Sequence, residues 1–161
     1  MKKLLVVLAF LVGGSAMQSA KAQVHISVNI GSQPVWGPVG YDYVEYYYLP
    51  DIDVFYSVPR RVYYYEDGGR WIYSRYLPVR YRSYDIYSGY KVVINNDPRP
   101  YMNITTYRAR YAPYRGRHDQ VIIRNSNDSR YYEIKEHPNH GKWKGNGNGN
   151  GNRGRGNGHH H

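Results

Sequence analysis

Alternation of apolar and polar residues is the main signal along the chain, and it predicts short β-strands. Residues 24–30 are the clearest case, because every second side chain is apolar and these side chains share one strand face. Pro50, Pro59 and Pro78 fall between later runs, where no hydrogen-bond donor is needed for a ladder. The other predicted strands are 43–49, 52–58, 62–66, 70–75 and 90–95, with 120–124 as a candidate for a last one.

A β-hairpin is predicted where residues 67–69, Asp-Gly-Gly, separate two β-forming runs. A short turn with glycine between such runs is the strongest local hairpin signal. Residues 67–68 are taken as the turn itself. Aromatic cross-strand pairs then contribute roughly 0.2–1 kcal/mol each. The pairs that this turn predicts are Tyr64 with Trp71 and Val62 with Tyr73.

The period of the pattern changes near Ile104. Ile104, Tyr107 and Tyr111 lie on one helical face, and Pro113 stops the run, so we expect a short helix over 104–112. The predicted fold is therefore mainly β: an antiparallel sheet or meander of about five to seven strands, with one short helix and a C-terminal tail.

The two ends of the chain differ from its middle in composition. Residues 1–22 combine two lysines, a nine-residue apolar run and a small-residue cleavage pattern, which is typical of an export signal. A span of the bilayer takes about 20 apolar residues, so this run is too short, and nothing later in the chain is apolar enough. Residues 144–161 contain almost only Gly, Asn, Arg and His and are expected to be disordered. Residues 23–143 are expected to form one β-rich domain with its core at 24–124, and 127–136 as a short helix or a turn.

Tyrosine and arginine dominate the composition. The chain has 21 Tyr against 2 Phe, and beyond residue 22 it has 15 Arg against 4 Lys. Tyrosine suits a thin sheet, because its ring packs while its hydroxyl stays in water. Arginine is preferred to lysine where a planar cation stacks on rings or grips phosphate and carboxylate at two points. The tyrosines expected in the core or half-buried in the sheet are Tyr47, Tyr56, Tyr64, Tyr73 and Tyr90.

The positive net charge and the export signal together indicate an anionic partner outside the cytoplasm. Without its leader the chain carries a net charge near +7, and an exported basic protein meets anionic polymers of the cell envelope. We expect a non-catalytic envelope protein, periplasmic, on the cell surface or extracellular, that binds anionic polymers or glycans through one exposed face of rings and guanidinium groups. Nucleic acid is not the expected partner. The candidate binding residues are Arg61, Arg70, Trp71, Tyr73, Arg75, Tyr76, Arg80 and Arg82.

Two other functions stay open. A small envelope hydrolase would have to use carboxylates, with Asp51 and Asp53 on one strand face and Asp85 as the candidates. A structural oligomer or fibre could form through pairing of edge strands. No cofactor motif and no cysteine is present, so we expect no cofactor and no disulfide. The histidines that could hold a metal, only weakly, are His137, His140, His159, His160 and His161.

Several segments are distinctive as strings: WGPVGYDY, YYYLPDI, GGRWIYSRYLP, GYKVVIN and HPNHGKWK. With them the chain resembles a family of small exported, Tyr- and Arg-rich proteins from Bacteroidetes bacteria, over roughly residues 33–143. That family has no assigned activity, cofactor or catalytic residue. The resemblance implies a bacterial, exported, single-domain protein and brings no site residue with it.

Overall fold

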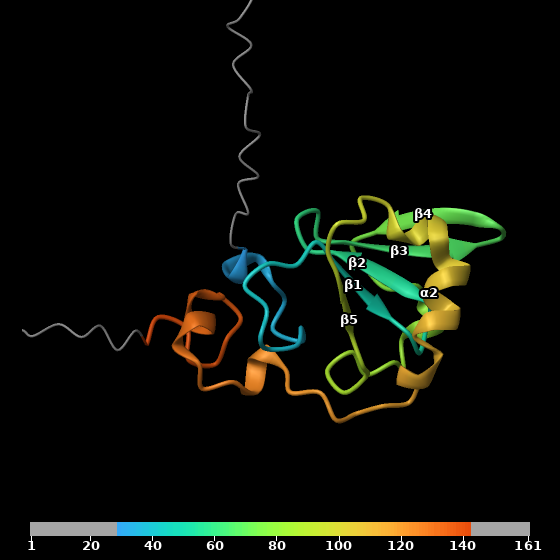
Figure 1. Cartoon of the computed structure of the whole chain (residues 1–161). Coiled ribbons are helices and arrows are strands. Elements are labelled where there is room, and N and C mark those ends of the chain that lie inside the picture. The colour runs from blue at the N-terminus through green and yellow to red at the C-terminus, as the bar shows by residue number, and fades with distance from the viewer. Residues whose placement is uncertain (1–28, 143–161) are drawn as a thin grey trace, which may run out of the picture.

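The structure is a computed structural model that describes residues 29–142. Five strands form one antiparallel sheet in the order β4-β3-β2-β1-β5 (Figure 1). The mainly β fold with one short helix is thereby confirmed. The predicted leader 1–22, most of the strand at 24–30 and the tail 144–161 lie outside the described residues. The strands are β1 (Tyr46–Leu49), β2 (Val54–Ser57), β3 (Val62–Asp67), β4 (Arg70–Ser74) and β5 (Val92–Ile94).

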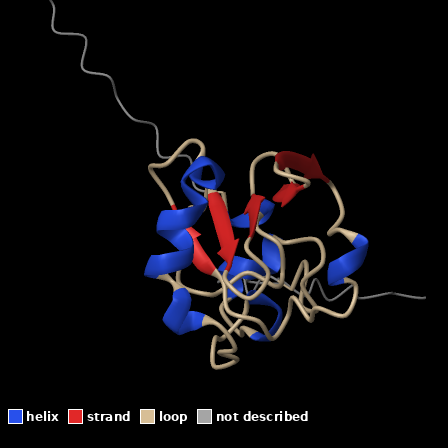
Figure 2. Ribbon diagram, turned by 90° about the vertical axis from the view of Figure 1, so that its right-hand side faces the viewer, coloured by secondary structure: helices blue, strands red, loops and turns tan. Residues whose placement is uncertain are grey.

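One face of the sheet is covered by α2 (Ile104–Arg110) and the 3-10 turn η3 (Pro100–Asn103), which precedes it directly. The predicted helix is confirmed, ending two residues earlier than expected. Tyr48 and Phe55 lie on this face with ring centroids 4.8 Å apart, and Tyr107 of α2 packs edge-on against Phe55 at 5.3 Å. Such aromatic pairs contribute about 0.5–1.5 kcal/mol beyond their buried area. Figure 2 shows the helix on one side of the sheet and mostly loops on the other.

The opposite face is covered by irregular segments instead of a helix. Trp36 is only 8% exposed and packs edge-on against Tyr47 and Tyr56, at 5.3 and 5.0 Å between centroids. It therefore covers the core from a Gly- and Pro-rich loop. The buried hydroxyl of Tyr47 donates to Gln33 Oε1 at 2.9 Å, so this polar group does not go unpaired.

The hairpin register differs from the prediction by two residues. The turn is Gly68-Gly69, with φ of 57° and 71°, so Asp67 pairs with Arg70. Two central residues with positive φ suit the right-handed twist of a hairpin, and glycine adopts that conformation without steric cost. The predicted pairs are wrong for this reason. The observed pairs are Tyr64 with Tyr73 and Glu66 with Trp71.

Three further expectations need correction. Asp51 and Asp53 lie in the turn before β2 and not on a strand. Residues 120–124 form no strand; Ile122 makes one isolated bridge and a 3-10 turn follows, η5 (Ile123–Asn125). Tyr73 is 75% exposed instead of half-buried, because β4 is the sheet edge, whereas Tyr47, Tyr56 and Tyr64 are buried and Tyr90 half-buried as expected. Residues 127–136, left open, contain the 3-10 helix η6 (Ser129–Glu133).

Candidate functional site

Seven of the eight candidate binding residues lie on β4 and on the segment that follows it. Arg61 is separate from them in the chain and lies in the turn between β2 and β3, at the end of the sheet opposite the hairpin turn. Side chains alternate along β4, so Trp71 and Tyr73 point to the face that α2 covers, and Arg70 to the other. The rings and the guanidinium groups therefore do not share one sheet face. They lie on both faces of β4, which is the edge strand, and on the segment that follows it.

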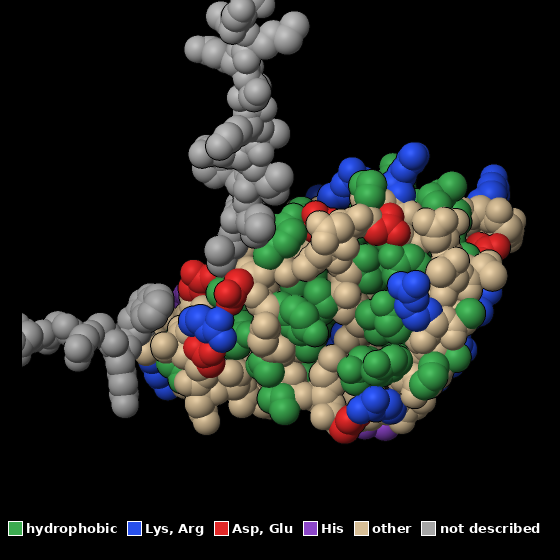
Figure 3. All heavy atoms as spheres, viewed as in Figure 1, with side chains coloured by type: hydrophobic (Ala, Val, Ile, Leu, Met, Phe, Trp, Pro, Cys, Tyr) green, Lys and Arg blue, Asp and Glu red, His purple; other side chains and the backbone are tan. Residues whose placement is uncertain are grey.

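The candidate residues of β4 and the segment after it differ in exposure and in whether their charges are paired. Within residues 29–142, Arg70, Arg75 and Arg82 are exposed and form no ion pair, and Tyr73 and Tyr76 are 75% and 79% exposed. We call these five residues the β4 ridge. Figure 3 shows Lys and Arg side chains between hydrophobic ones along the border of the molecule where β4 lies.

Arg80 has a different environment from the ridge arginines. Its guanidinium donates to Asp67 Oδ1 at 2.8 Å and to the main-chain oxygen of Glu66 at 2.6 Å. It also lies over the rings of Tyr65 and Tyr81, at 5.6 and 5.0 Å from their centroids. Arg80 thus fastens the 3-10 turn η2 (Val79–Tyr81) to the hairpin, and much of its binding capacity is used inside the fold.

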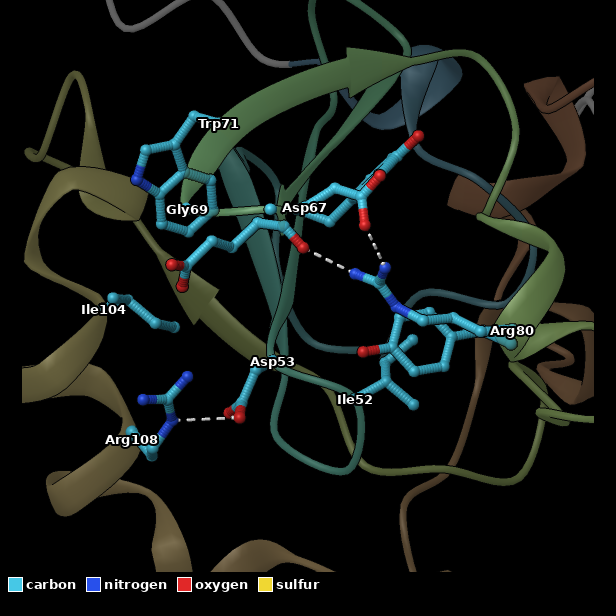
Figure 4. A pocket seen from close by; sticks show the side chains of 12 residues that line it. Ile52, Asp53, Asp67, Gly69, Trp71, Arg80, Ile104 and Arg108 are labelled. Carbon is cyan, nitrogen blue, oxygen red and sulfur yellow. Dashed lines mark hydrogen bonds and ion pairs between the residues drawn. The ribbon is translucent and has the colours of Figure 1, made fainter.

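A cleft of about 280 Å³ lies beside the hairpin turn (Figure 4). Its walls come from the hairpin, the β1–β2 turn, η2 and α2, and they include Trp71, Glu66, Arg80, Asp53 and Arg108. The Glu66 side chain has no ion-pair or hydrogen-bond partner within residues 29–142. An indole ring beside a carboxylate and guanidinium groups suits a sugar, which offers an apolar ring face and several hydroxyls.

Asp53 closes one side of the cleft and joins three segments. Its Oδ1 accepts hydrogen bonds from the Tyr48 hydroxyl at 2.7 Å and from Arg115 Nη2 at 2.6 Å, and its Oδ2 accepts from Arg108 Nε at 3.0 Å. Burial by itself would raise the pKa of Asp53, but these hydrogen bonds outweigh it and lower the pKa. Asp53 therefore stays ionised at neutral pH and holds α2 and the segment after it against the sheet.

The other two carboxylates of the hydrolase hypothesis also accept hydrogen bonds from the fold. Asp51 Oδ1 accepts from the main-chain N–H of Gly116 at 2.7 Å. Asp85 Oδ1 accepts from the N–H of Tyr87 at 2.9 Å, and this bond is the main reason why the pKa of Asp85 is lowered. A general acid needs a raised pKa, and neither Asp53 nor Asp85 has one.

A second cavity, of about 260 Å³, lies on the loop-covered face and contains Arg61. Trp36, Tyr56 and Tyr87 give it aromatic walls, and Glu136 also lines it. Arg61 has a φ of 56°, a left-handed conformation that costs a non-glycine residue roughly 1 kcal/mol. Backbone strain of this kind is concentrated at functional sites, so the cavity is a secondary candidate for a small ligand.

The histidine prediction falls only partly on described residues. His137 is buried; its Nδ1 accepts from the N–H of Asn139 at 3.0 Å, so its Nε2 carries the proton donated to the Ile123 oxygen at 3.1 Å. His140 Nδ1 contacts the Tyr132 oxygen. Residues 159–161 lie outside the described part. Among residues 29–142, no three His, Asp or Glu side chains are close enough together to hold a metal ion.

Comparisons with known proteins add no assignment. No protein-family model, no curated protein and no solved structure matches the chain significantly. None of the helices in the described part is long and apolar enough to cross a membrane.

Three charged residues of the cleft were not among the candidates from the sequence: Glu66, Asp67 and Arg108. A local signal existed for the first two, since an acidic pair precedes the Gly-Gly turn directly. No local signal existed for Arg108, because its partner Asp53 is 55 residues away in the chain.

Proposed function

We propose that this is an exported, non-catalytic protein of the cell envelope that binds anionic glycans or related polymers through the β4 ridge. The observation that carries the proposal is the ridge itself: three arginines that form no ion pair with any residue of 29–142, alternating in the sequence with two exposed tyrosines. Export is supported by the pattern of residues 1–22.

An arginine without an ion pair loses less on binding a ligand than an arginine that is already paired. An arginine already held by an aspartate must break that pair to bind a ligand, whereas Arg70, Arg75 and Arg82 need not. A guanidinium grips phosphate, sulfate or carboxylate at two points, and tyrosine stacks on the apolar face of a sugar. The ridge therefore matches a polymer in which charged groups and sugar rings alternate.

The cleft beside the ridge supports the glycan part of the proposal. It is large enough for one sugar unit, and Trp71 and Glu66 offer a ring for stacking and an acceptor for hydroxyl groups. Because the cleft contains both charges, it favours a neutral or zwitterionic unit over a free anion. The arginines of the ridge would then bind the anionic groups on neighbouring units.

The experiment compares two double variants with the same change of net charge. Arg75→Ala/Arg82→Ala removes two ridge arginines, and Arg117→Ala/Arg130→Ala removes two exposed arginines that are paired with aspartates. Binding to peptidoglycan, lipopolysaccharide, an acidic polysaccharide and uncharged dextran is measured at low and high salt. At low salt the ridge variant should bind an anionic polymer roughly 5- to 30-fold more weakly, as expected for two contacts of 0.5–1 kcal/mol each, and the control less than about 2-fold.

Equal weakening by both variants would mean that net charge alone attracts the polymer. Retention of wild type on none of the polymers at low salt would remove the proposal. A second pair of variants tests the rings: Tyr73→Ala/Tyr76→Ala should weaken binding at high salt, where screening has already removed most of the charge contribution.

A further inference from the structure

The outer edge of β4 is open. The strand is the last in the sheet order, and no strand of the part that the structure describes pairs with its outer side. Sheet edges with unpaired main-chain groups are templates for another strand, and proteins usually block them with proline, a bulge or a covering segment. Over its five residues, RWIYS, β4 has no proline, and its one charged residue, Arg70, stands next to the hairpin turn.

The turn determines which main-chain groups point outward. In a two-residue hairpin the pair that flanks the turn, here Asp67 and Arg70, exchanges both hydrogen bonds, and the pairs then alternate. Arg70, Ile72 and Ser74 therefore direct their N–H and C=O groups to β3. Trp71 and Tyr73 direct theirs to the open edge, where no hydrogen bond from residues 29–142 reaches them.

The other edge of the sheet is better protected. β5 has only three residues. The Gln120 side chain forms hydrogen bonds with both main-chain groups of Lys91, the residue just before β5. Gln120 Oε1 accepts from the Lys91 N–H, and its Nε2 donates to the Lys91 oxygen, both at 2.9 Å. This amide imitates a neighbouring strand. The contrast makes β4 the edge at which a further strand would add.

We propose that β4 pairs with β4 of a second copy, antiparallel and with the two-fold axis at Ile72. In this register Trp71 lies opposite Tyr73 of the second copy, and Tyr73 opposite Trp71, so all the outward main-chain groups of both strands are paired. A shift by two residues toward the turn would require Gly69, which has a φ of 71°, and a shift the other way would require Arg75, beyond the strand end. Only the register centred on Ile72 uses both outward residues within β4.

The side chains of β4 suit the same register. Trp71 and Tyr73 lie on one face, so each copy contributes two rings to a shared aromatic surface, and cross-strand aromatic pairs are favourable. Arg70 lies opposite Ser74 of the second copy, so the arginines are not placed opposite each other. A strand that is complementary to itself favours a second copy over an unrelated peptide, and a closed two-fold pair leaves no free β4 edge for further growth.

A cysteine-free chain permits a direct test of the register. In the proposed dimer Ile72 lies opposite itself in a pair without hydrogen bonds, with about 4.5 Å between Cα atoms, which is within the roughly 4.4–6.8 Å that a disulfide spans. Under a mild oxidant the full chain carrying Ile72→Cys should form a covalent dimer. The same chain with Tyr76→Cys, a more exposed position outside the strand, should do so at least about tenfold more slowly. Equal rates would overturn the proposed register.

The second test uses proline on the open edge. Tyr73→Pro removes an N–H that β3 does not use, so the monomer should still fold, while the dimer loses donors and meets a steric block. Tyr73→Ala is the matched control, because it removes the same ring and keeps the N–H. Sedimentation equilibrium at raised salt should show a dimer of wild type, with the dissociation constant at least about tenfold higher for Tyr73→Pro than for Tyr73→Ala. A wild-type chain that stays monomeric up to roughly 1 mM, or equal constants for the two variants, would overturn the proposal.

This dimer does not depend on polymer binding. Both tests are made without polysaccharide, so their failure leaves the proposed function standing, and loss of polymer binding leaves the dimer standing.

Discussion

The hydrogen bonds of Asp53 predict how much one side-chain charge contributes to this fold. Asp53→Asn is the cleanest change, because asparagine has the same shape and also tolerates the φ of 52° at this position. The amide nitrogen takes the place of one carboxylate oxygen. If it replaces Oδ2, it faces the N–H of Arg108, and that hydrogen bond is lost. The bonds from Tyr48 and Arg115 change from an ionised to a neutral acceptor.

The magnitude follows from these three contacts. Weakening the two bonds to Oδ1 costs about 1 kcal/mol each, because charge-assisted hydrogen bonds are about twice as strong as neutral ones. Losing the partly exposed Arg108 contact costs about 0.5 kcal/mol. The sum of about 2–3 kcal/mol is a large part of the 5–15 kcal/mol that stabilises a typical domain.

Urea unfolding at pH 7, followed by circular dichroism, measures this loss. The control is Asp119→Asn, which disturbs an exposed pair with Arg117 and should change the free energy of unfolding far less than Asp53→Asn does. The folded pKa of Asp53 lies below its ordinary value of 3.8, so its contribution is complete above about pH 5 and is lost as the pH falls through the folded pKa. Wild type and Asp53→Asn should therefore converge in acid. A difference below about 0.5 kcal/mol at pH 7, or one that persists in acid, would refute the reasoning.

Three other predictions concern the turns and a buried lysine. Arg61→Gly should raise the free energy of unfolding by about 0.5–1 kcal/mol in urea titrations, because glycine tolerates the φ of 56°; Arg61→Ala should not, and equal effects would exclude strain as the cause. Gly69→Ala should lower it by about 1 kcal/mol, and an unchanged unfolding midpoint would contradict the left-handed turn. Burial lowers the pKa of Lys91 to about 8, so the folded chain binds fewer protons than the unfolded chain above that pH and stability should rise from pH 8 to about 9.5. Lys91→Met should flatten this rise in urea midpoints, and an unchanged slope would assign it to another group.

Local patterns predicted most of the sheet. Alternating apolar residues and the prolines between runs located all five strands to within a few residues, and the spacing of Ile104, Tyr107 and Tyr111 located the helix. Both patterns act over a few residues, so a single sequence reveals them. The hairpin turn was misplaced by one residue, because Asp-Gly and Gly-Gly both form tight turns and only the whole sheet selects between them.

The candidate site was less predictable because it depends on distant contacts. Composition indicates that arginine and tyrosine matter, but it cannot show that Arg115 pairs with Asp53, 62 residues away, while Arg75 pairs with no carboxylate in the described part. The same holds for exposure. Tyr64 and Tyr73 pair across the hairpin, yet only the second lies at the sheet edge and stays in water.

The positions of the tryptophans allow the core and the cleft to be followed separately by fluorescence. Trp36 is enclosed on the loop-covered face, and Trp71 lines the cleft on the opposite side of the sheet. In a chain in which phenylalanine replaces Trp36 and Trp143, light at the long-wavelength edge, which tyrosine does not absorb, would excite Trp71 alone. Quenching of that fluorescence by iodide would register occupancy of the cleft, separately from the integrity of the core.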